Sequence, residues 1–443
     1  MDALRSQRPR RPIAQVLVLL VISVCLSGCD DASVPDLDPM APAVDVALPD
    51  SPIDLSTLLP TLERQLLDHG ATLHPPLGDA ALERLQKSLP CRLPHLLAQI
   101  YRWHDGVDRI VPAYDLLPLA QVVEDYHAIQ AMERDIGVPE SAGWPKTYLP
   151  ILRMDAQEYI ALDCTAPDQG ALLHNFNEDP RWDARYRGLG HFLRVTSSAY
   201  ELGAYRLRDG DLDEWPLRYA QAFRAHAHPQ ELTALEAHWS KVSDALAHGS
   251  SAGLRLAVTW ATMFPHERYV AVLVRRLSDR NPAVVAIAAF ALGELRAQDA
   301  EPALAIQLSH PSGEVRNFAA GALARLERID PQSGTVGTLI ALLDDPDELV
   351  RLSAIEALAT ARSSTAVAPL VAVLAHSRPG IQLQVVHTLG ELRDRSALAA
   401  LRQLRAQLAA QSPLPDRGGT RGSDPPPQRL LAAVDDALRK IGP

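Results

Sequence analysis

The chain has 443 residues and a formal net charge of −11 at pH 7. Its length predicts about two or three domains, each able to bury a core, and its acidic balance argues against a nucleic acid partner, because no basic stripe is present to neutralise phosphates. Alanine is dense and aromatic residues are scarce after Trp260, so the two halves of the chain differ in kind.

The first 28 residues have the parts of an export signal. Arginines precede an apolar run over residues 13–24, which is too short to span a bilayer as a helix. The run leads into Leu26-Ser27-Gly28-Cys29, which resembles a bacterial lipobox. The resemblance implies that residues 1–28 are a lipoprotein signal peptide and that Cys29 carries a lipid anchor. An ordinary secretory signal with an incidental cysteine is the alternative.

Residues 29–52 are rich in proline, aspartate, alanine and valine and lack periodicity, which predicts a disordered tether. We therefore expect a lipid-anchored protein of the bacterial cell envelope that faces the periplasm or the exterior. Asp30, directly after the lipidated cysteine, resembles an inner-membrane retention signal of some bacteria, and the choice between inner and outer membrane stays open. Cys91 and Cys164 can form one disulfide in these oxidising surroundings, or remain two isolated buried thiols.

Helical and strand patterns alternate between residues 53 and 207. Apolar stripes and helix-ending signals predict helices over residues 53–70, 79–89, 95–103, 119–134 and 187–205. Short apolar segments predict strands over residues 148–153, 159–163 and 171–176. This order indicates an α+β domain with one sheet partly covered by helices.

Several short motifs occur in this domain in a fixed order: Leu93-Pro94, Tyr101-Arg-Trp-His-Asp-Gly106, Leu116-Leu117-Pro118-Leu119, Leu149-Pro150 and Tyr159-Ile-Ala-Leu-Asp163. Their order and spacing resemble the Knr/Smi domain of the SUKH superfamily, with a core over residues 75–207. Asp105 stands where many members have asparagine. The resemblance implies an α+β protein-binding domain without shared catalytic residues. In bacteria this family is rich in immunity proteins that neutralise toxins, and in fungi it includes regulators of cell-wall synthesis.

Residues 208–230 are expected to connect this domain to a repeat region over residues 231–443. Helix-ending segments recur there about every 31 residues. They are Ala261-Thr262, Ala291-Leu292-Gly293, Ala322-Leu323-Ala324, Ala357-Leu358-Ala359 and Thr388-Leu389-Gly390. The recurrence resembles HEAT-like repeats of the short bacterial type found in phycobilin-lyase relatives. A last second helix is predicted over residues 428–441, after a mobile loop at 412–427.

The expected fold is therefore multidomain, an α+β SUKH-like domain followed by an all-α HEAT-repeat solenoid. Such solenoids use long exposed faces to bind partners, although this one can also be only a spacer or a cap. Arg316 and Arg351 recur at one repeat position, and we expect each to pair with an acidic residue of an adjacent hairpin, such as Asp345 or Glu314.

Motifs for enzymatic chemistry are absent from the sequence. There is no nucleophile elbow, phosphate-binding glycine loop, Cys-x-x-Cys or His-Glu-x-x-His. The spacing of His226 and His228 puts their rings on different faces of a helix, which disfavours a metal site. Asp155, Glu158 and Asp163 can imitate a catalytic carboxylate pair but fit the polar ends of the sheet better. We expect no catalytic residue, metal, cofactor or small-molecule substrate.

Aromatic residues near loops and strand ends are the better candidates for function, because such side chains anchor protein interfaces. They are Tyr101, Trp103, Trp144, Tyr148 and Tyr159. Trp103 is equally typical of a core residue. The sequence favours a non-catalytic, lipid-anchored protein that binds another protein, either a toxin that it neutralises or an envelope enzyme that it recruits as a scaffold in cell-wall biogenesis. An unrecognised hydrolase is the weakest alternative.

Overall fold

The computed structural model describes residues 53–138, 143–154, 158–165, 171–175, 182–208, 211–410 and 427–442. The predicted signal peptide, Cys29, the tether and almost all of the predicted mobile loop lie outside these residues. The described chain forms two compact units, and the boundary between Lys241 and Val242 falls within helix α8 (Pro229–His248). Each unit is described by itself.

A seven-stranded sheet forms the centre of the first unit, and its antiparallel strands follow the order β1 to β7. The strands are β1 (Thr72–Leu73), β2 (Val107–Val111), β3 (Tyr114–Leu116), β4 (Tyr148–Arg153), β5 (Tyr159–Asp163), β6 (Leu172–Asn175) and β7 (Trp182–Tyr186). Leu116, Leu152 and Ile160 pair across neighbouring strands and are buried. Consecutive residues from Leu149 to Leu152 of β4 and from Ile160 to Leu162 of β5 are buried, so both faces of these central strands are covered.

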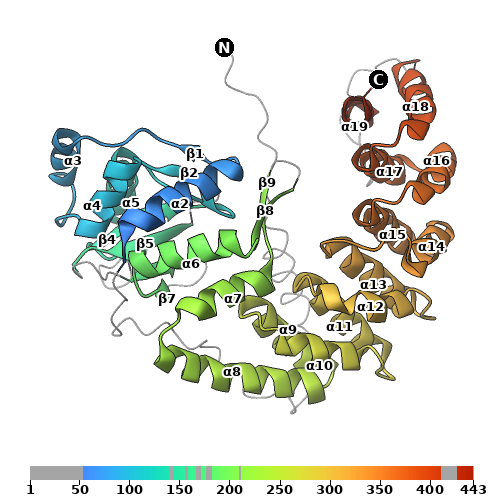
Figure 1. Cartoon of the computed structure of the whole chain (residues 1–443), viewed down its shortest axis with the longest axis horizontal. Helices are drawn as coiled ribbons and strands as arrows, with labels where there is room; N and C mark the ends of the chain where they lie inside the picture. Colours follow the sequence, from blue (N-terminus) through green and yellow to red (C-terminus); the bar gives the residue numbers. More distant parts are fainter. Residues whose placement is uncertain are drawn as a thin grey trace. The chain divides into compact units, whose positions relative to one another are not determined.

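Helices pack against this sheet and complete the core (Figure 1). They are α2 (Leu55–Asp68), α3 (Asp79–Gln86), α4 (His95–Trp103), α5 (Leu119–Ile136), α6 (Leu189–Glu201) and α7 (Pro216–His226). The apolar stripe of α2 buries Leu62 and Leu66, as its spacing predicts. The α+β fold expected from the sequence is therefore confirmed.

The first unit continues beyond the predicted boundary at residue 207. A two-stranded hairpin, β8 (Tyr205–Arg208) and β9 (Asp211–Glu214), precedes α7. Tyr219 and Phe223 of α7 pack against the core, and α7 lies against α6. Residues 211–226, which we expected to be part of a connecting segment, are therefore folded onto the first unit, because their apolar side chains are covered there.

The second unit is a stack of helical hairpins. Its helices are α9 (Ser251–Met263), α10 (Arg268–Arg276), α11 (Pro282–Glu294), α12 (Glu301–Gln307), α13 (Gly313–Arg325), α14 (Gly334–Ala341), α15 (Glu348–Ala361), α16 (Val367–His376), α17 (Pro379–Leu392), α18 (Leu398–Ala410) and α19 (Pro427–Ile441). The first helices of the hairpins, α10 to α18 in even numbers, lie along one side, and the second helices, α11 to α19 in odd numbers, lie along the other (Figure 1).

Small residues in the recurring segments let second helices approach closely. A Cβ atom at Gly293 would lie 2.7 Å from the Cα of Ala322, and one at Gly390 would lie 3.1 Å from the Cα of Ala437. The last position of one segment therefore packs on the first position of the next. The same contact places α19 in the stack as a second helix, which confirms that prediction.

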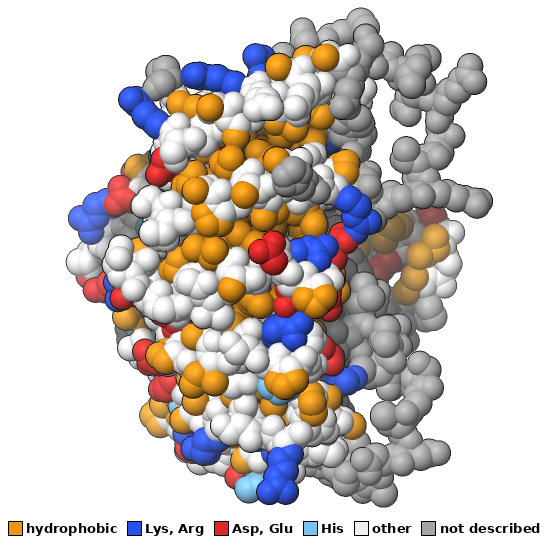
Figure 2. Space-filling model, turned by 90° about the vertical axis from the view of Figure 1, so that its right-hand side faces the viewer, with side chains coloured by type: hydrophobic (Ala, Val, Ile, Leu, Met, Phe, Trp, Pro, Cys, Tyr) orange, Lys and Arg blue, Asp and Glu red, His pale blue; other side chains and the backbone are white. Residues whose placement is uncertain are grey.

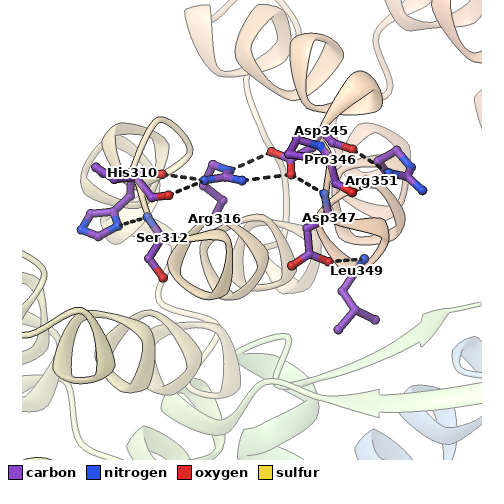
Figure 3. A network of polar contacts seen from close by, with 9 residues as sticks. His310, Ser312, Arg316, Asp345, Pro346, Asp347, Leu349 and Arg351 are labelled. Atoms are coloured by element: carbon purple, nitrogen blue, oxygen red, sulfur yellow. Dashed lines mark hydrogen bonds and ion pairs between the residues drawn. The ribbon is translucent and has the colours of Figure 1, made fainter.

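Polar contacts connect the turns of neighbouring hairpins (Figure 3). The guanidinium of Arg316 donates to both carboxylate oxygens of Asp345, at 2.7 and 3.0 Å, which confirms the predicted pair. This bond lowers the pKa of Asp345. Arg351 differs, because it donates to the backbone oxygens of Asp345 and Pro346 and lies 3.8 Å from Glu348. The next turn offers no aspartate to Arg351, since Arg378 precedes the proline there.

Two neighbouring first helices of the second unit are free of charged residues. Helices α14 and α16 contain no Asp, Glu, Lys or Arg, and Ile306 on α12 is 72% exposed. Figure 2 looks onto the first-helix side and shows hydrophobic side chains running along it. Among the residues that the structure describes, no helix is both long and apolar enough to cross a membrane.

Candidate functional site

The motif around Tyr101 holds the fold of the first unit together. Tyr101 is fully buried, and its hydroxyl donates to the backbone oxygen of Leu117 at 3.2 Å. The Asp105 carboxylate accepts from the backbone N–H of Leu119 at 2.8 Å, at the start of α5. Gly106 has a φ of +101°, and a Cβ atom there would lie 2.8 Å from the nitrogen of Pro118. Our assignment of Tyr101 as an interface anchor is therefore wrong, because its ring lies in the core.

Trp103 is partly exposed beside α2. Its indole N–H donates to Glu63 at 3.0 Å, and its ring meets the ring of His104 edge-on at 4.6 Å. One edge of the indole therefore contacts other residues of the first unit. The rest of the ring is accessible, so Trp103 stays a candidate residue for contact with a partner.

The structure brings Trp144, Tyr148 and Tyr159 together. The indole N–H of Trp144 donates to the backbone oxygen of Tyr148 at 2.7 Å, and the rings of Trp144 and Tyr159 meet edge-on at 5.7 Å. The Tyr159 hydroxyl donates to Asp125, which also accepts from Arg153. Burial and the Asp125 charge raise the pKa of Tyr159 to about 12, so it stays a neutral donor. Trp144 thus contacts the ring of Tyr159 and the backbone of Tyr148, and all three aromatic residues are partly exposed.

Cys91 and Cys164 form a disulfide, with their Cα atoms 6.2 Å apart. This decides between the two alternatives that the sequence leaves open. The bond ties the chain after α3 to the end of β5.

Several of the carboxylates and histidines considered for chemistry have structural partners among the described residues. Asp163 accepts from the backbone and the hydroxyl of Thr165, and His226 shares a hydrogen bond with Ser198. Asp155 lies outside the described residues, and Glu158 is partly buried. No group of three or more potential ligands is placed to hold a metal ion within the described part of the chain.

A buried polar cluster between α6 and α8 was not found from the sequence. Arg187 and Glu231 form an ion pair whose side chains are 2% and 4% exposed. His191 is also fully buried, and its Nε2 has no hydrogen-bond partner among the described residues. Burial and then the charges of Arg187, Arg194 and His226 lower the pKa of His191 to about 3. Glu231 lies more than forty residues after Arg187 in the sequence, so the cluster is recognisable only in the folded chain.

The first unit is expected to lose stability as the pH falls below about 6.5, because the unfolded His191 takes up a proton there. The folded ring resists protonation until a pH of about 3, where its pKa lies. The unfolded state therefore binds more protons in this window, which costs the folded state about 2–3 kcal/mol between pH 6.5 and 4.5. Denaturant unfolding at several pH values measures this slope. His191→Phe, which cannot take up a proton, should show a shallower slope, and an equally steep one would contradict the prediction.

The second helices expose side chains at four repeating positions, which we call the second-helix face. The positions are counted from the first residue of the recurring segment in α11, α13, α15 and α17. The position eight residues before it holds Ala283, Glu314, Leu349 and Gly380, and the position four before it holds Ile287, Phe318, Ser353 and Gln384. The residues directly before the segment are Phe290, Gly321, Glu356 and His387, and those directly after the segment are Glu294, Arg325, Thr360 and Glu391. All of these residues are partly or fully exposed. They are spaced at three or four residues, so they share one face of each helix.

Contacts between neighbouring helices make this face continuous. The rings of Phe290 and Phe318 meet edge-on at 5.9 Å. Glu294 forms an ion pair with Arg325 at 3.1 Å, and burial raises the pKa of Glu294. The register that defines the face follows from the repeat, but its side-chain contacts could not be read from the sequence.

Comparison with known proteins agrees with this architecture. Residues 76–194 match the SMI1/KNR4 family (SUKH-1), and residues 270–335 and 336–409 match HEAT repeats. Both families are generally non-catalytic and bind proteins. No curated protein matches the chain.

Solved structures similar to the chain include engineered proteins and designed armadillo repeat proteins. An engineered protein is 20% identical, with a TM-score of 0.35, and the match covers 45% of this chain and 95% of that one. A designed armadillo repeat protein is 18% identical, with a TM-score of 0.31, over 48% of this chain and 95% of that one. The chain is thus a two-module protein, in which an α+β SUKH-type domain precedes an all-α HEAT-repeat solenoid.

Proposed function

We propose that this chain is a lipid-anchored, non-catalytic protein of the bacterial cell envelope that works by binding another protein. The main observation behind the proposal is that the motif residues of the first unit stabilise the fold, whereas side chains of the second-helix face are accessible to a partner. Motif residues such as Tyr101, Asp105 and Gly106 are engaged within the fold. Apolar, aromatic and acidic side chains remain accessible on the second-helix face. Such a distribution suits contact with a macromolecule.

An exported location is supported by two independent features. The lipobox-like segment ending at Cys29 is typical of a lipoprotein. The Cys91–Cys164 disulfide suits an oxidising compartment, because cytosolic thiols are generally kept reduced. The protein then faces the periplasm or the exterior.

Within this class we favour an immunity or toxin-neutralising role, because the first unit resembles a family rich in immunity proteins. A membrane anchor suits a toxin that acts in the envelope. The alternative is a scaffold in envelope or cell-wall biogenesis, in which the solenoid recruits enzymes, and the HEAT repeats support it.

Affinity purification of the full chain from detergent-solubilised membranes tests the proposal. We expect a stoichiometric protein partner and protection of producing cells against a neighbour's toxin. Recovery of a cell-wall synthase without any toxin would favour the scaffold.

Cys29→Ser should move the protein out of the membrane fraction, and continued membrane association would contradict the lipid anchor. Recovery of no specific partner would overturn the binding function.

A further inference from the structure

We infer that the second-helix face of α11, α13 and α15 binds a cationic segment of the partner protein, one that places lysine or arginine beside an apolar or aromatic side chain. This inference rests on the proposed protein-binding function and adds the chemistry of the partner and the surface that receives it.

The apolar part of this surface lies on α11 and α13. Ile287 and Phe290 are partly exposed one turn apart, and the ring of Phe318 meets that of Phe290 across the two helices. Leu349 on α15 is 60% exposed. Gly321 occupies the register position between Phe290 and Glu356, where a Cβ atom would lie 3.5 Å from Nη1 of Arg325 and 3.7 Å from Oγ of Ser353. Aromatic rings held at a helix–helix contact offer rigid apolar area at a small cost in side-chain entropy.

The charges around these side chains are mainly negative. On α11, α13 and α15, carboxylates occupy the face at Glu294, Glu314 and Glu356, against the one guanidinium of Arg325. That guanidinium is already engaged, because it pairs with Glu294 and donates to the backbone oxygen of Gly321 at 3.0 Å. Glu314 and Glu356 are exposed and form no ion pair with any residue that the structure describes.

The geometry puts one carboxylate next to the aromatic pair. Glu314 precedes Phe318 by one helical turn, so their Cβ atoms lie about 5–6 Å apart. Glu356 lies one helix beyond Gly321, at a spacing of about 8–10 Å. A partner segment can therefore place an apolar side chain on Phe290 and Phe318 while its ammonium or guanidinium groups meet Glu314 and Glu356.

Two helices on the opposite side of the solenoid lack this combination. Helices α14 and α16 on the first-helix side carry no charged residue, so that side offers a cationic segment no carboxylate on these two helices. Ile306 on α12 therefore serves as a matched control position, since it is apolar and even more exposed than Leu349.

The test uses the full chain carrying Cys29→Ser and a synthetic helical peptide in which lysines flank a tryptophan. Two control peptides carry glutamate at every lysine or alanine at the tryptophan. Fluorescence anisotropy at low and high salt gives each dissociation constant, and circular dichroism checks that each variant is folded. The binding variants are Phe290→Ala with Phe318→Ala, and Glu314→Gln with Glu356→Gln. The matched controls are Ile306→Ala and Glu83→Gln, an exposed carboxylate on α3.

We expect the phenylalanine variant to weaken binding of the cationic peptide about tenfold. The glutamine variant should weaken it several-fold and reduce its salt dependence, whereas the controls should bind like the parent chain. Equal binding of the glutamate peptide, equal binding by the variants, or no binding of the cationic peptide would each overturn the inference. If the natural partner copurifies equally with the phenylalanine variant, protein binding stands and this surface assignment falls.

Discussion

Removal of the Cys91–Cys164 disulfide is expected to lower the free energy of unfolding of the first unit by about 4 kcal/mol. The two cysteines are 73 residues apart in the sequence. A cross-link over such a loop removes many conformations from the unfolded chain, and the stabilisation grows with the logarithm of loop length. For a unit of this size the loss corresponds to a fall in melting temperature of roughly 10 °C.

The double variant Cys91→Ala with Cys164→Ala measures this effect without any reductant. Calorimetry should show that the transition of the first unit moves to lower temperature. The transition of the second unit is the internal control, because the disulfide lies wholly within the first unit. Thiol labelling of the unfolded wild-type chain should find Cys91 and Cys164 blocked until a reductant is added. Labelling of both without reductant would show that the bond is not formed.

The parts of the fold that sequence reasoning predicted are those with strong local periodicity. Helices α2 and α5 and the solenoid helices bury residues at helical spacing, so their existence follows from nearby residues alone. Strands β4 and β5 also agree with their predicted bounds, because each is a short apolar run that ends in a charged residue.

The elements that sequence reasoning missed depend on distant contacts. β7 contains Asp183 and Arg185 between its aromatic ends, and β8 and β9 are largely charged, so none of them looks like a buried strand. Each forms because a neighbouring strand supplies its hydrogen bonds. The disulfide likewise needed a Cα distance, which a sequence does not contain.

The candidate site was predicted only in part, for a related reason. Tyr101 lies just before a loop, a position that favours exposure. Its side chain is nevertheless buried, and its hydroxyl donates a hydrogen bond to the backbone oxygen of Leu117. Trp144 contacts both Tyr159 and the backbone of Tyr148, but it does so from a loop whose course the sequence does not indicate. The second-helix face becomes visible only when the repeat register is combined with burial, which separates Phe290 from its buried neighbours Ala289 and Ala291.

Ala357→Glu is expected to destabilise the second unit by about 3–5 kcal/mol. Ala357 is fully buried and occupies the first position of its recurring segment. Ala322 and Ala437 occupy the equivalent position in other repeats. Each packs so closely on a glycine of the preceding second helix that a Cβ atom added to that glycine would lie within 3.1 Å of the alanine Cα. A glutamate there would separate α13 from α15 and would bury a charge without a partner.

Ala372→Glu is the matched control, because Ala372 is exposed on the first helix α16 of the same solenoid. It introduces the same charge into the same unit and should change the stability by less than about 0.5 kcal/mol. Each hairpin is stabilised mainly by its neighbours, so the loss at Ala357 should broaden or split the unfolding transition of the second unit. An unchanged melting profile for Ala357→Glu would mean that the small residues of the recurring segments do not face the neighbouring helix, and the register that defines the second-helix face would then be wrong as well.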